Sequence, residues 1–128
     1  MGKDKLTILF VDDDPDFSGA MSLWFKNKGY DTLVAPDGEQ GIRRIKENSP
    51  DIVFLDLRMP GMGGIDTLKE IRSFNQDIPV IVISAHADED RIAEAQALKA
   101  SGVFHKGNDF TEGLSLIETA LRTHEKLK

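Results

Sequence analysis

The chain has 128 residues, with 22 acidic and 16 basic side chains, a formal net charge of −6 and no cysteine. This length is typical of one compact domain, so we expect residues 1–128 to form a single domain. The absence of cysteine excludes a disulfide framework, cysteine-ligated metal centres and a thiol nucleophile, which leaves oxygen and nitrogen chemistry.

The acidic charge balance argues against direct binding to nucleic acid, because such binding draws its affinity from clustered Lys and Arg side chains. The first residues are charged and lead directly into a short apolar run. Neither a signal-peptide core nor a run near the roughly 18 apolar residues of a membrane span is present. We therefore expect a cytoplasmic protein with no membrane contact.

Short apolar runs alternate along the chain with longer amphipathic stretches, a pattern typical of βαβ units around a parallel sheet. Most of these runs lack a clean polar alternation, which indicates strands buried on both faces beneath helices. The sequence thus predicts an α/β domain whose five strands cover Leu6–Val11, Asp31–Ala35, Ile52–Asp56, Val80–Ser84 and Val103–Lys106.

The stretches between the strands have the 3.6-residue periodicity of helices that each bury one stripe. The stripe is clearest near the C-terminus, at Phe110, Leu114, Ile117 and Leu121. A helix near Asp88–Lys99 is the least hydrophobic, since small alanines separate its few large apolar residues. We expect this helix to shift most easily. The stripes of the first three helices consist of Phe17, Met21 and Trp24, then Ile42 and Ile45, then Ile65, Leu68 and Ile71.

Acidic residues follow two of the predicted strands directly. Asp12, Asp13 and Asp14 come after the first strand, and Asp56 ends the third. Ligands of open parallel sheets bind outside the carboxyl ends of the strands, so these acids would share one edge. Clustered carboxylates favour a divalent cation, and hard oxygen ligands suit Mg²⁺ or Mn²⁺. The alternative is that the triplet only caps the first helix, and we expect one of the three to do so.

Two further strand ends add a hydroxyl and an ammonium group. Ser84 closes the fourth predicted strand and Lys106 the fifth. Each alone is commonly an ordinary turn or surface residue. Together with the acids they make a site for a cation and a phosphoryl group, with an aspartate as nucleophile and Lys106 as a fixed positive charge.

With these residues in place, the sequence resembles the receiver domain of bacterial two-component response regulators over nearly its whole length. The resemblance implies a single flavodoxin-like (βα)5 domain, with a five-stranded parallel sheet of order 2-1-3-4-5 and helices on both faces. The segments that carry it are Ile8-Leu9-Phe10-Val11-Asp12-Asp13-Asp14, Asp56-Leu57-Arg58-Met59-Pro60-Gly61-Met62-Gly63-Gly64, Ile83-Ser84-Ala85 and Lys106.

The resemblance also implies a role for each site residue. Asp56 would accept a phosphoryl group from a phosphohistidine on a histidine kinase or phosphotransfer protein. Asp13 would bind Mg²⁺ directly and Asp12 mainly through water. The remaining metal ligands would be Asp56 and the backbone carbonyl of Arg58, whereas Ser84 and Lys106 would bind the phosphoryl oxygens. Such a domain catalyses only its own phosphorylation and dephosphorylation.

The sequence departs from the family pattern in two places. Gly107 follows Lys106 where many receivers have proline, and without proline a cis peptide costs about 2.5–4 kcal/mol, so we predict a trans Lys106–Gly107 bond. The switch position three residues before Lys106, usually Tyr or Phe, is Val103. The adjacent Phe104 points to the other face of its strand and is expected in the core. Signalling is therefore expected to depend more on movement of the fourth helix.

Two positions that flank the phosphoryl group in this family are occupied by Arg58 and His86. We hypothesise that Arg58 reaches the phosphoryl oxygens or shields them from water; both residues are otherwise ordinary loop residues. His105 and His124 are interpreted as surface histidines, because they neither pair at ligand spacing nor lie beside the acids.

Two other functions stay open. Asp12-x-Asp14 faintly resembles the haloacid dehalogenase phosphohydrolases, which would use Asp12 as nucleophile, although Pro15 and Asp16 do not fit that pattern. The chain is alternatively a receiver-like binding module that no longer uses phosphorylation, for which Val103 is the main argument.

The output of a lone receiver must reach another protein or a further domain. The resemblance implies signalling through the fourth helix, fifth strand and fifth helix, by a monomer or a phosphorylation-linked dimer. A stand-alone regulator and a domain cut from a larger protein are both compatible with the sequence. Candidate output contacts are Arg91, Glu94, Lys99, Glu112 and Arg122.

Overall fold

The structure is a computed structural model and describes residues 5–85 and 89–126. Strands and helices alternate strictly along the chain, as the sequence predicts. None of the helices in these residues is long and apolar enough to cross a membrane. The elements are β1 (Thr7–Val11), α1 (Pro15–Asn27), β2 (Asp31–Ala35), α2 (Gly38–Asn48), β3 (Ile52–Asp56), α3 (Gly64–Phe74), β4 (Val80–Ser84), α4 (Glu89–Ala97), β5 (Gly102–His105) and α5 (Phe110–Lys126).

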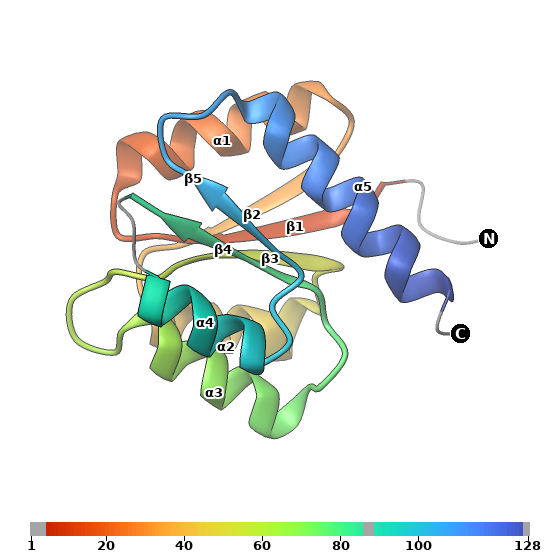
Figure 1. The fold of residues 1–128 in the computed structure, drawn as a ribbon. Coiled ribbons are helices and arrows are strands. Elements are labelled where there is room, and N and C mark those ends of the chain that lie inside the picture. The colour runs from red at the N-terminus through yellow and green to blue at the C-terminus, as the bar shows by residue number, and fades with distance from the viewer. Residues whose placement is uncertain (1–4, 86–88, 127–128) are drawn as a thin grey trace.

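The five strands form one parallel sheet in the order β2-β1-β3-β4-β5. Helices α1 and α5 cover one face of the sheet, and α2, α3 and α4 cover the other (Figure 1). The predicted α/β fold and its strand order are confirmed. Because all strands run in the same direction, their carboxyl ends meet at one edge.

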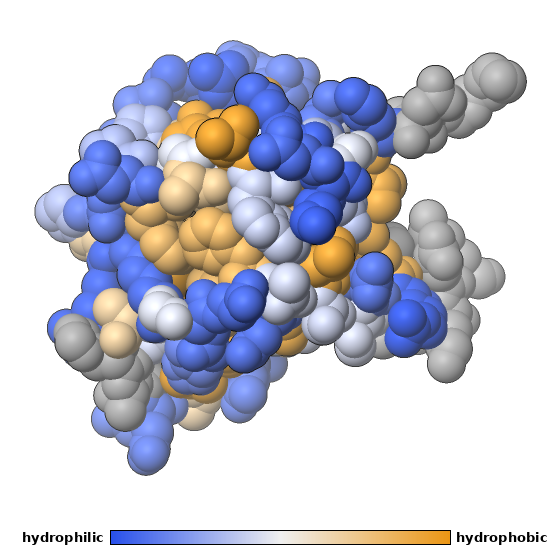
Figure 2. Space-filling view, turned by 90° about the horizontal axis from the view of Figure 1, so that it is seen from above, coloured by the Kyte–Doolittle hydropathy of each residue, from blue (hydrophilic) through white to orange (hydrophobic). Residues whose placement is uncertain are grey.

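The core consists of one apolar cluster on each face of the sheet. Neighbouring strand residues alternate between them: Leu9 packs toward α2 and α3, whereas Phe10 joins the aromatic cluster beneath α1 and α5. Phe104 is buried in that aromatic cluster and Val103 packs on the opposite face, as predicted. Figure 2, which views the α1/α5 side, shows an apolar area among hydrophilic side chains.

The boundaries differ from the predicted ones at three elements. Strand β1 begins at Thr7 instead of Leu6, and α4 ends at Ala97, short of Lys99. Strand β5 covers Gly102–His105, so Lys106 lies directly after the strand and not within it. The Lys106 N–H still donates to the Ser84 carbonyl at 2.9 Å, which continues the ladder by one bond before the chain turns.

Helix α4 is held less firmly than the others by apolar packing. Ala95 is its only fully buried residue. The buried Arg72 of α3 compensates at one end, because its guanidinium donates to the carbonyls of Leu98 and Lys99, just after the helix, at 2.8 and 3.1 Å. The structure therefore ties α4 at its C-terminal end, and the expectation that this helix shifts most easily stays a prediction.

Candidate functional site

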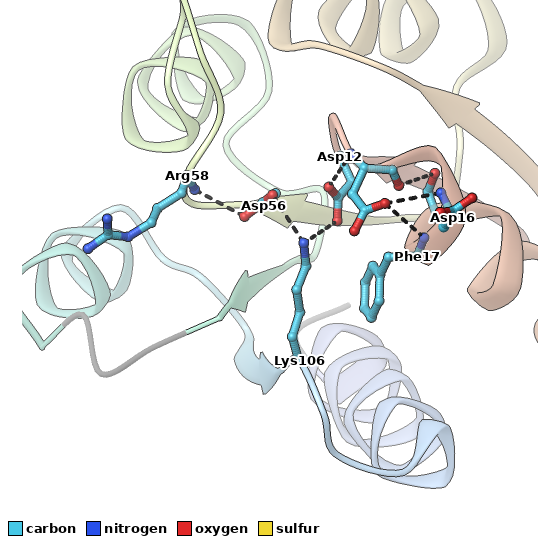
Figure 3. A network of polar contacts seen from close by, with 8 residues as sticks. Asp12, Asp16, Phe17, Asp56, Arg58 and Lys106 are labelled. Atoms are coloured by element: carbon cyan, nitrogen blue, oxygen red, sulfur yellow. Dashed lines mark hydrogen bonds and ion pairs between the residues drawn. The ribbon is translucent and has the colours of Figure 1, made fainter.

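Three carboxylates meet at the carboxyl edge of the sheet, and Figure 3 shows two of them, Asp12 and Asp56, on either side of Lys106. Asp12 and Asp13 follow β1 and Asp56 ends the neighbouring β3, so that one carboxylate oxygen of each lies within 4.8 Å of the others. Asp12 and Asp56 are 2% and 3% exposed, whereas Asp13 is exposed to solvent. The parallel register thus produces the acid cluster that the sequence predicts.

Lys106 places its ammonium group between the two buried acids. Its Nζ lies 3.3 Å from Asp12 Oδ2 and 3.6 Å from Asp56 Oδ2. Burial alone lowers the pKa of Lys106, but the attraction of Asp12 and Asp56 outweighs it, so the net shift is upward. Lys106 is therefore a fixed positive charge. We call Asp12, Asp13, Asp56 and Lys106 together the acid pocket.

Asp56 has an unusual ionisation for an aspartate. Loss of solvent raises its pKa from 3.8 to about 7, and repulsion by Asp12 adds to the rise. The Arg58 N–H, which donates to Asp56 Oδ1 at 3.0 Å, and the charge of Lys106 act in the opposite direction. Since one lysine does not balance the acids, the pocket favours the arrival of further positive charge.

A divalent cation fits the pocket on the chemistry of its oxygens. Asp12 Oδ1 accepts from the Asp14 N–H at 2.9 Å, but Asp12 Oδ2 is the one buried side-chain oxygen or nitrogen in residues 5–85 and 89–122 that has no hydrogen bond. The Lys106 ammonium lies 3.3 Å from this oxygen. Three carboxylates with such an oxygen among them are a hard, incompletely satisfied donor set, which suits Mg²⁺ or Mn²⁺.

The three consecutive acids Asp12, Asp13 and Asp14 have two different structural roles. Asp14 is the N-cap of α1, and its side chain accepts from the N–H groups of Asp16 and Phe17. Pro15 occupies the first turn, where its missing N–H costs nothing. The prediction that one of the three acids caps the helix is confirmed, and Asp12 and Asp13 remain for the pocket.

Ser84 lies at the same edge as the acids. It ends β4, whose preceding residue Ile83 pairs with Asp56, and it is buried. Its carbonyl accepts the Lys106 N–H, so the ends of β4 and β5 are tied together. The structure therefore places Ser84 at the carboxyl edge beside the strand that ends in Asp56, and its role at the site stays a prediction.

The Arg58 side chain extends away from Asp56 in this structure (Figure 3), while its backbone N–H donates to that carboxylate. Arg58 and Arg91 of α4 line an open cavity of about 540 Å³ beside the β3–α3 loop. The hypothesis that Arg58 reaches the phosphoryl oxygens stays a prediction. His86 lies outside the described residues, and His105 is exposed.

The turn after Lys106 follows the sequence prediction. The Lys106–Gly107 bond is trans, since no peptide bond in residues 5–85 and 89–126 is cis. Gly107 has φ +94°, a left-handed conformation that residues with a Cβ adopt only with strain.

Sequence reasoning missed two supports of the pocket. Gly64, which begins α3, approaches the end of β3 so closely that a Cβ would lie 2.2 Å from the Asp56 carbonyl oxygen. Phe17, assigned only to the core stripe of α1, places its ring beneath the Lys106 ammonium, 4.8 Å from the ring centre. The glycine pair Gly63-Gly64 was visible in the sequence, but the Phe17 contact joins segments far apart in the chain.

The fold and the pocket together define a flavodoxin-like α/β domain with an acidic, cation-adapted carboxyl edge. The sequence pattern of the response regulator receiver domain matches residues 8–118. The chain therefore belongs to the response regulator receiver domains, the signalling domains of two-component systems.

Curated relatives agree with this assignment. The chain is 34% identical over 121 residues to the sporulation initiation phosphotransferase F of Bacillus subtilis, covering 94% of each protein. It is also 34% identical to the transcriptional regulatory protein ZraR of Klebsiella oxytoca, covering 99% of this chain but 28% of that protein. The chain thus spans less than a third of that longer relative.

Solved structures show the same architecture. A CheY-like receiver domain protein from Methanospirillum hungatei superposes with a TM-score of 0.92 at 20% identity, covering 98% of this chain and all of that one. The receiver domain of NtrX from Brucella abortus superposes with a TM-score of 0.86 at 28% identity, covering 91% of this chain and 98% of that chain.

Proposed function

We propose that this receiver accepts a phosphoryl group on Asp56 from a histidine kinase or a histidine phosphotransfer protein. The observation that carries the proposal is the acid pocket itself: a buried aspartate, fixed by the Arg58 N–H and beside Lys106, within 4.8 Å of two further carboxylates. No structural requirement of the sheet demands three acids and a lysine there, so their convergence supports a chemical role.

The transfer step needs one nucleophile and no separate base. A carboxylate oxygen of Asp56 attacks the phosphorus of a phosphohistidine, the P–O bond forms, the P–N bond breaks, and the departing imidazole takes a proton from solvent. Hydrolysis of the acyl phosphate by water later restores Asp56. The domain would catalyse only these two steps on itself.

The residues around Asp56 supply charge and position. A bound Mg²⁺ or Mn²⁺ would offset the negative charge of the acids and of the phosphoryl oxygens. Asp12, Asp13, Asp56 and the Arg58 carbonyl would hold that ion. Lys106 and the Ser84 hydroxyl would bind the phosphoryl oxygens, each from a strand end that the ladder already fixes.

The signal would leave through α4, β5 and α5. Helix α4 has one fully buried residue, Ala95, and Val103 on β5 leaves a small side chain on the same face of the sheet. We propose residues 1–128 as one receiver domain, acting alone or as part of a longer protein, as a monomer or a phosphorylation-linked dimer. An output protein or effector domain is the partner it requires. Cytoplasmic location stays a prediction.

Intact mass spectrometry tests the proposal. The protein is incubated with Mg²⁺ and a small acyl-phosphate donor, and we expect a species heavier by roughly 80 Da, the mass of one phosphoryl group. Asp56→Asn and excess EDTA should each abolish it, whereas Asp66→Asn, an exposed carboxylate on α3, should not. Absence of the species with every donor, in folded protein with Mg²⁺, would favour a receiver-like binding module that does not use phosphorylation.

A further inference from the structure

We propose that Phe17 is a positioning residue for the phosphorylation of Asp56, because its ring holds the Lys106 ammonium over the acid pocket through a cation–π contact. This inference rests on the proposed function, since it assigns a second residue to the same reaction. Phe17 would not touch the phosphoryl group. Its effect would pass entirely through Lys106.

The geometry joins three groups on one ammonium. Lys106 Nζ lies 4.8 Å from the centre of the Phe17 ring, inside the range of about 6 Å over which the ring quadrupole attracts a cation. The same Nζ pairs with Asp12 and Asp56. The Lys106 side chain is only 22% exposed, so little water competes with these contacts. Figure 3 shows the ring and the ammonium on the same side of the pocket.

The Phe17 ring is itself well fixed. Its backbone N–H donates to the Asp14 N-cap at 3.3 Å, which sets the first turn of α1. Its ring packs against those of Phe104 and Phe110, with centroid distances of 6.3 and 6.0 Å. A side chain held by a helix cap and two aromatic neighbours offers Lys106 a rigid surface.

The Phe17 ring supplements two long ion pairs in holding the Lys106 side chain. The residue follows the last strand and precedes the left-handed Gly107, and its ammonium lies 3.3 and 3.6 Å from the two acids, longer than a good charged hydrogen bond. Positive charge arriving at the pocket would weaken the pull of the acids on the lysine. The ring does not change charge during the reaction, so its hold on the ammonium persists.

A purely structural role for Phe17 predicts different behaviour, and ring fluorination separates the two. Fluorine substituents weaken the negative face of the ring while they nearly preserve its shape. We would incorporate phenylalanine analogues with one, two and three ring fluorines at position 17 and measure the rate of Asp56 phosphorylation by a small acyl-phosphate donor with Mg²⁺. The rate should fall stepwise, by about threefold to tenfold across the series. A flat series at equal thermal stability would overturn the inference.

Two ordinary variants supply the controls. Phe17→Tyr retains the aromatic face and should keep most of the rate, whereas Phe17→Leu should lower it about as much as three fluorines. Trp24→Leu is the matched control, because it removes a half-buried ring of the same helix whose cation–π partner is Lys28. Trp24→Leu should leave the rate within about twofold, and an equal loss in both leucine variants would contradict the inference.

An NMR measurement on the metal-free protein detects the contact between Phe17 and Lys106 independently of phosphorylation. The ε-methylene protons of Lys106 should be shifted upfield by the ring current of Phe17, and the shift should vanish in Phe17→Leu but persist in Trp24→Leu. An unshifted methylene in the wild type would overturn the inference. If the wild type is never phosphorylated, the proposed function fails as well; if it is phosphorylated and the fluorinated series is flat, only the role of Phe17 fails.

Discussion

Both ends of the sheet bury charged side chains, but the two ends differ in how those charges are paired. At the amino end, Arg72 is 6% exposed and directs its guanidinium at the carbonyls of Asn75, Ile78, Leu98 and Lys99, at 2.8 to 3.2 Å. We call this set the Arg72 network. At the carboxyl end, the acid pocket holds three carboxylates against one lysine and leaves a buried oxygen of Asp12 without a hydrogen bond.

The difference separates a structural charge from a reactive one. The Arg72 guanidinium donates four hydrogen bonds to carbonyls and so joins the end of α3, the turn before β4 and the turn after α4. The acid pocket instead has surplus negative charge and a buried Asp12 oxygen that has an ion pair with Lys106 but no hydrogen bond, so it can bind a further cation. Arg72, Asp12 and Asp56 are all buried, so burial alone does not distinguish a structural charge from a reactive one.

Removal of Arg72 should produce the largest loss of stability. Arg72→Met keeps much of the side-chain volume but leaves the four carbonyls without their donor, so we expect unfolding to become easier by about 3 kcal/mol. Urea denaturation measures the change. Lys69→Met on the exposed side of α3 is the control and should change little. A small loss in Arg72→Met would show that the Arg72 network does not carry structure.

Removal of the Asp56 charge should increase stability, in contrast to removal of Arg72. The pKa of Asp56 is about 7 in the folded chain and near 3.8 when unfolded. Protonation therefore favours the folded state, and this stabilisation is present below pH 4 and lost as the pH rises through 7. In EDTA, Asp56→Asn should be more stable than wild type, by about 2 kcal/mol more at pH 8 than at pH 5.

Urea denaturation at the two pH values measures this difference, with Asp31→Asn, an exposed carboxylate on β2, as the control. A gain in Asp56→Asn that does not depend on pH would mean that the pocket does not raise the pKa of this aspartate.

Binding of Mg²⁺ should raise the free energy of unfolding of the domain, and this gain should depend on the residues of the acid pocket. At a concentration ten times its Kd, a ligand of the folded state adds about 1.4 kcal/mol. Thermal unfolding with and without Mg²⁺ should show this gain in wild type and lose it in Asp13→Asn. Asp14→Asn is the matched control, because asparagine is an equally good N-cap and Asp14 caps α1. Equal Mg²⁺ effects in both variants would remove Asp13 from the metal site.

A smaller change in stability tests whether Lys99 contributes to the Arg72 network through its backbone carbonyl alone. Lys99 offers its carbonyl to Arg72 from a left-handed conformation with φ +66°. Lys99→Gly relieves that strain while keeping the carbonyl, and after the entropy of the unfolded chain is counted we expect a gain of about 0.5 kcal/mol. Lys69→Gly within α3 should instead lose about 1 kcal/mol. A loss in Lys99→Gly would assign a role to the lysine side chain.

The sequence predicts the acid pocket far better than the Arg72 network, for a physical reason. Parallel strands bring their carboxyl ends together, so residues that follow apolar runs, such as Asp12 and Asp56, can be placed without coordinates. The boundaries of β3 and β4 were predicted because their continuous apolar runs end sharply. Strand β5 was displaced by one residue, since Gly102 carries no apolar signal but still pairs with Ile81.

Contacts that depend on how helices lie across the sheet could not be predicted. An arginine in an amphipathic helix is normally exposed, and the partners of Arg72 are carbonyls up to 27 residues away in turns without a sequence signature. The ring of Phe17 was correctly placed in the apolar stripe of α1, but its contact with Lys106 depends on the distance between α1 and the end of β5. Such contacts are set by packing and not by periodicity.

The most direct test of the account is to locate the phosphoryl group in the labelled protein. Borohydride reduction converts a phosphorylated aspartate to homoserine, and peptide sequencing by mass spectrometry then identifies the position. The incompletely satisfied acid pocket predicts homoserine at Asp56 alone, in a reaction that requires Mg²⁺. Homoserine at Asp12, as a haloacid dehalogenase-type hydrolase would give, or phosphorylation that persists in Asp56→Asn, would contradict it.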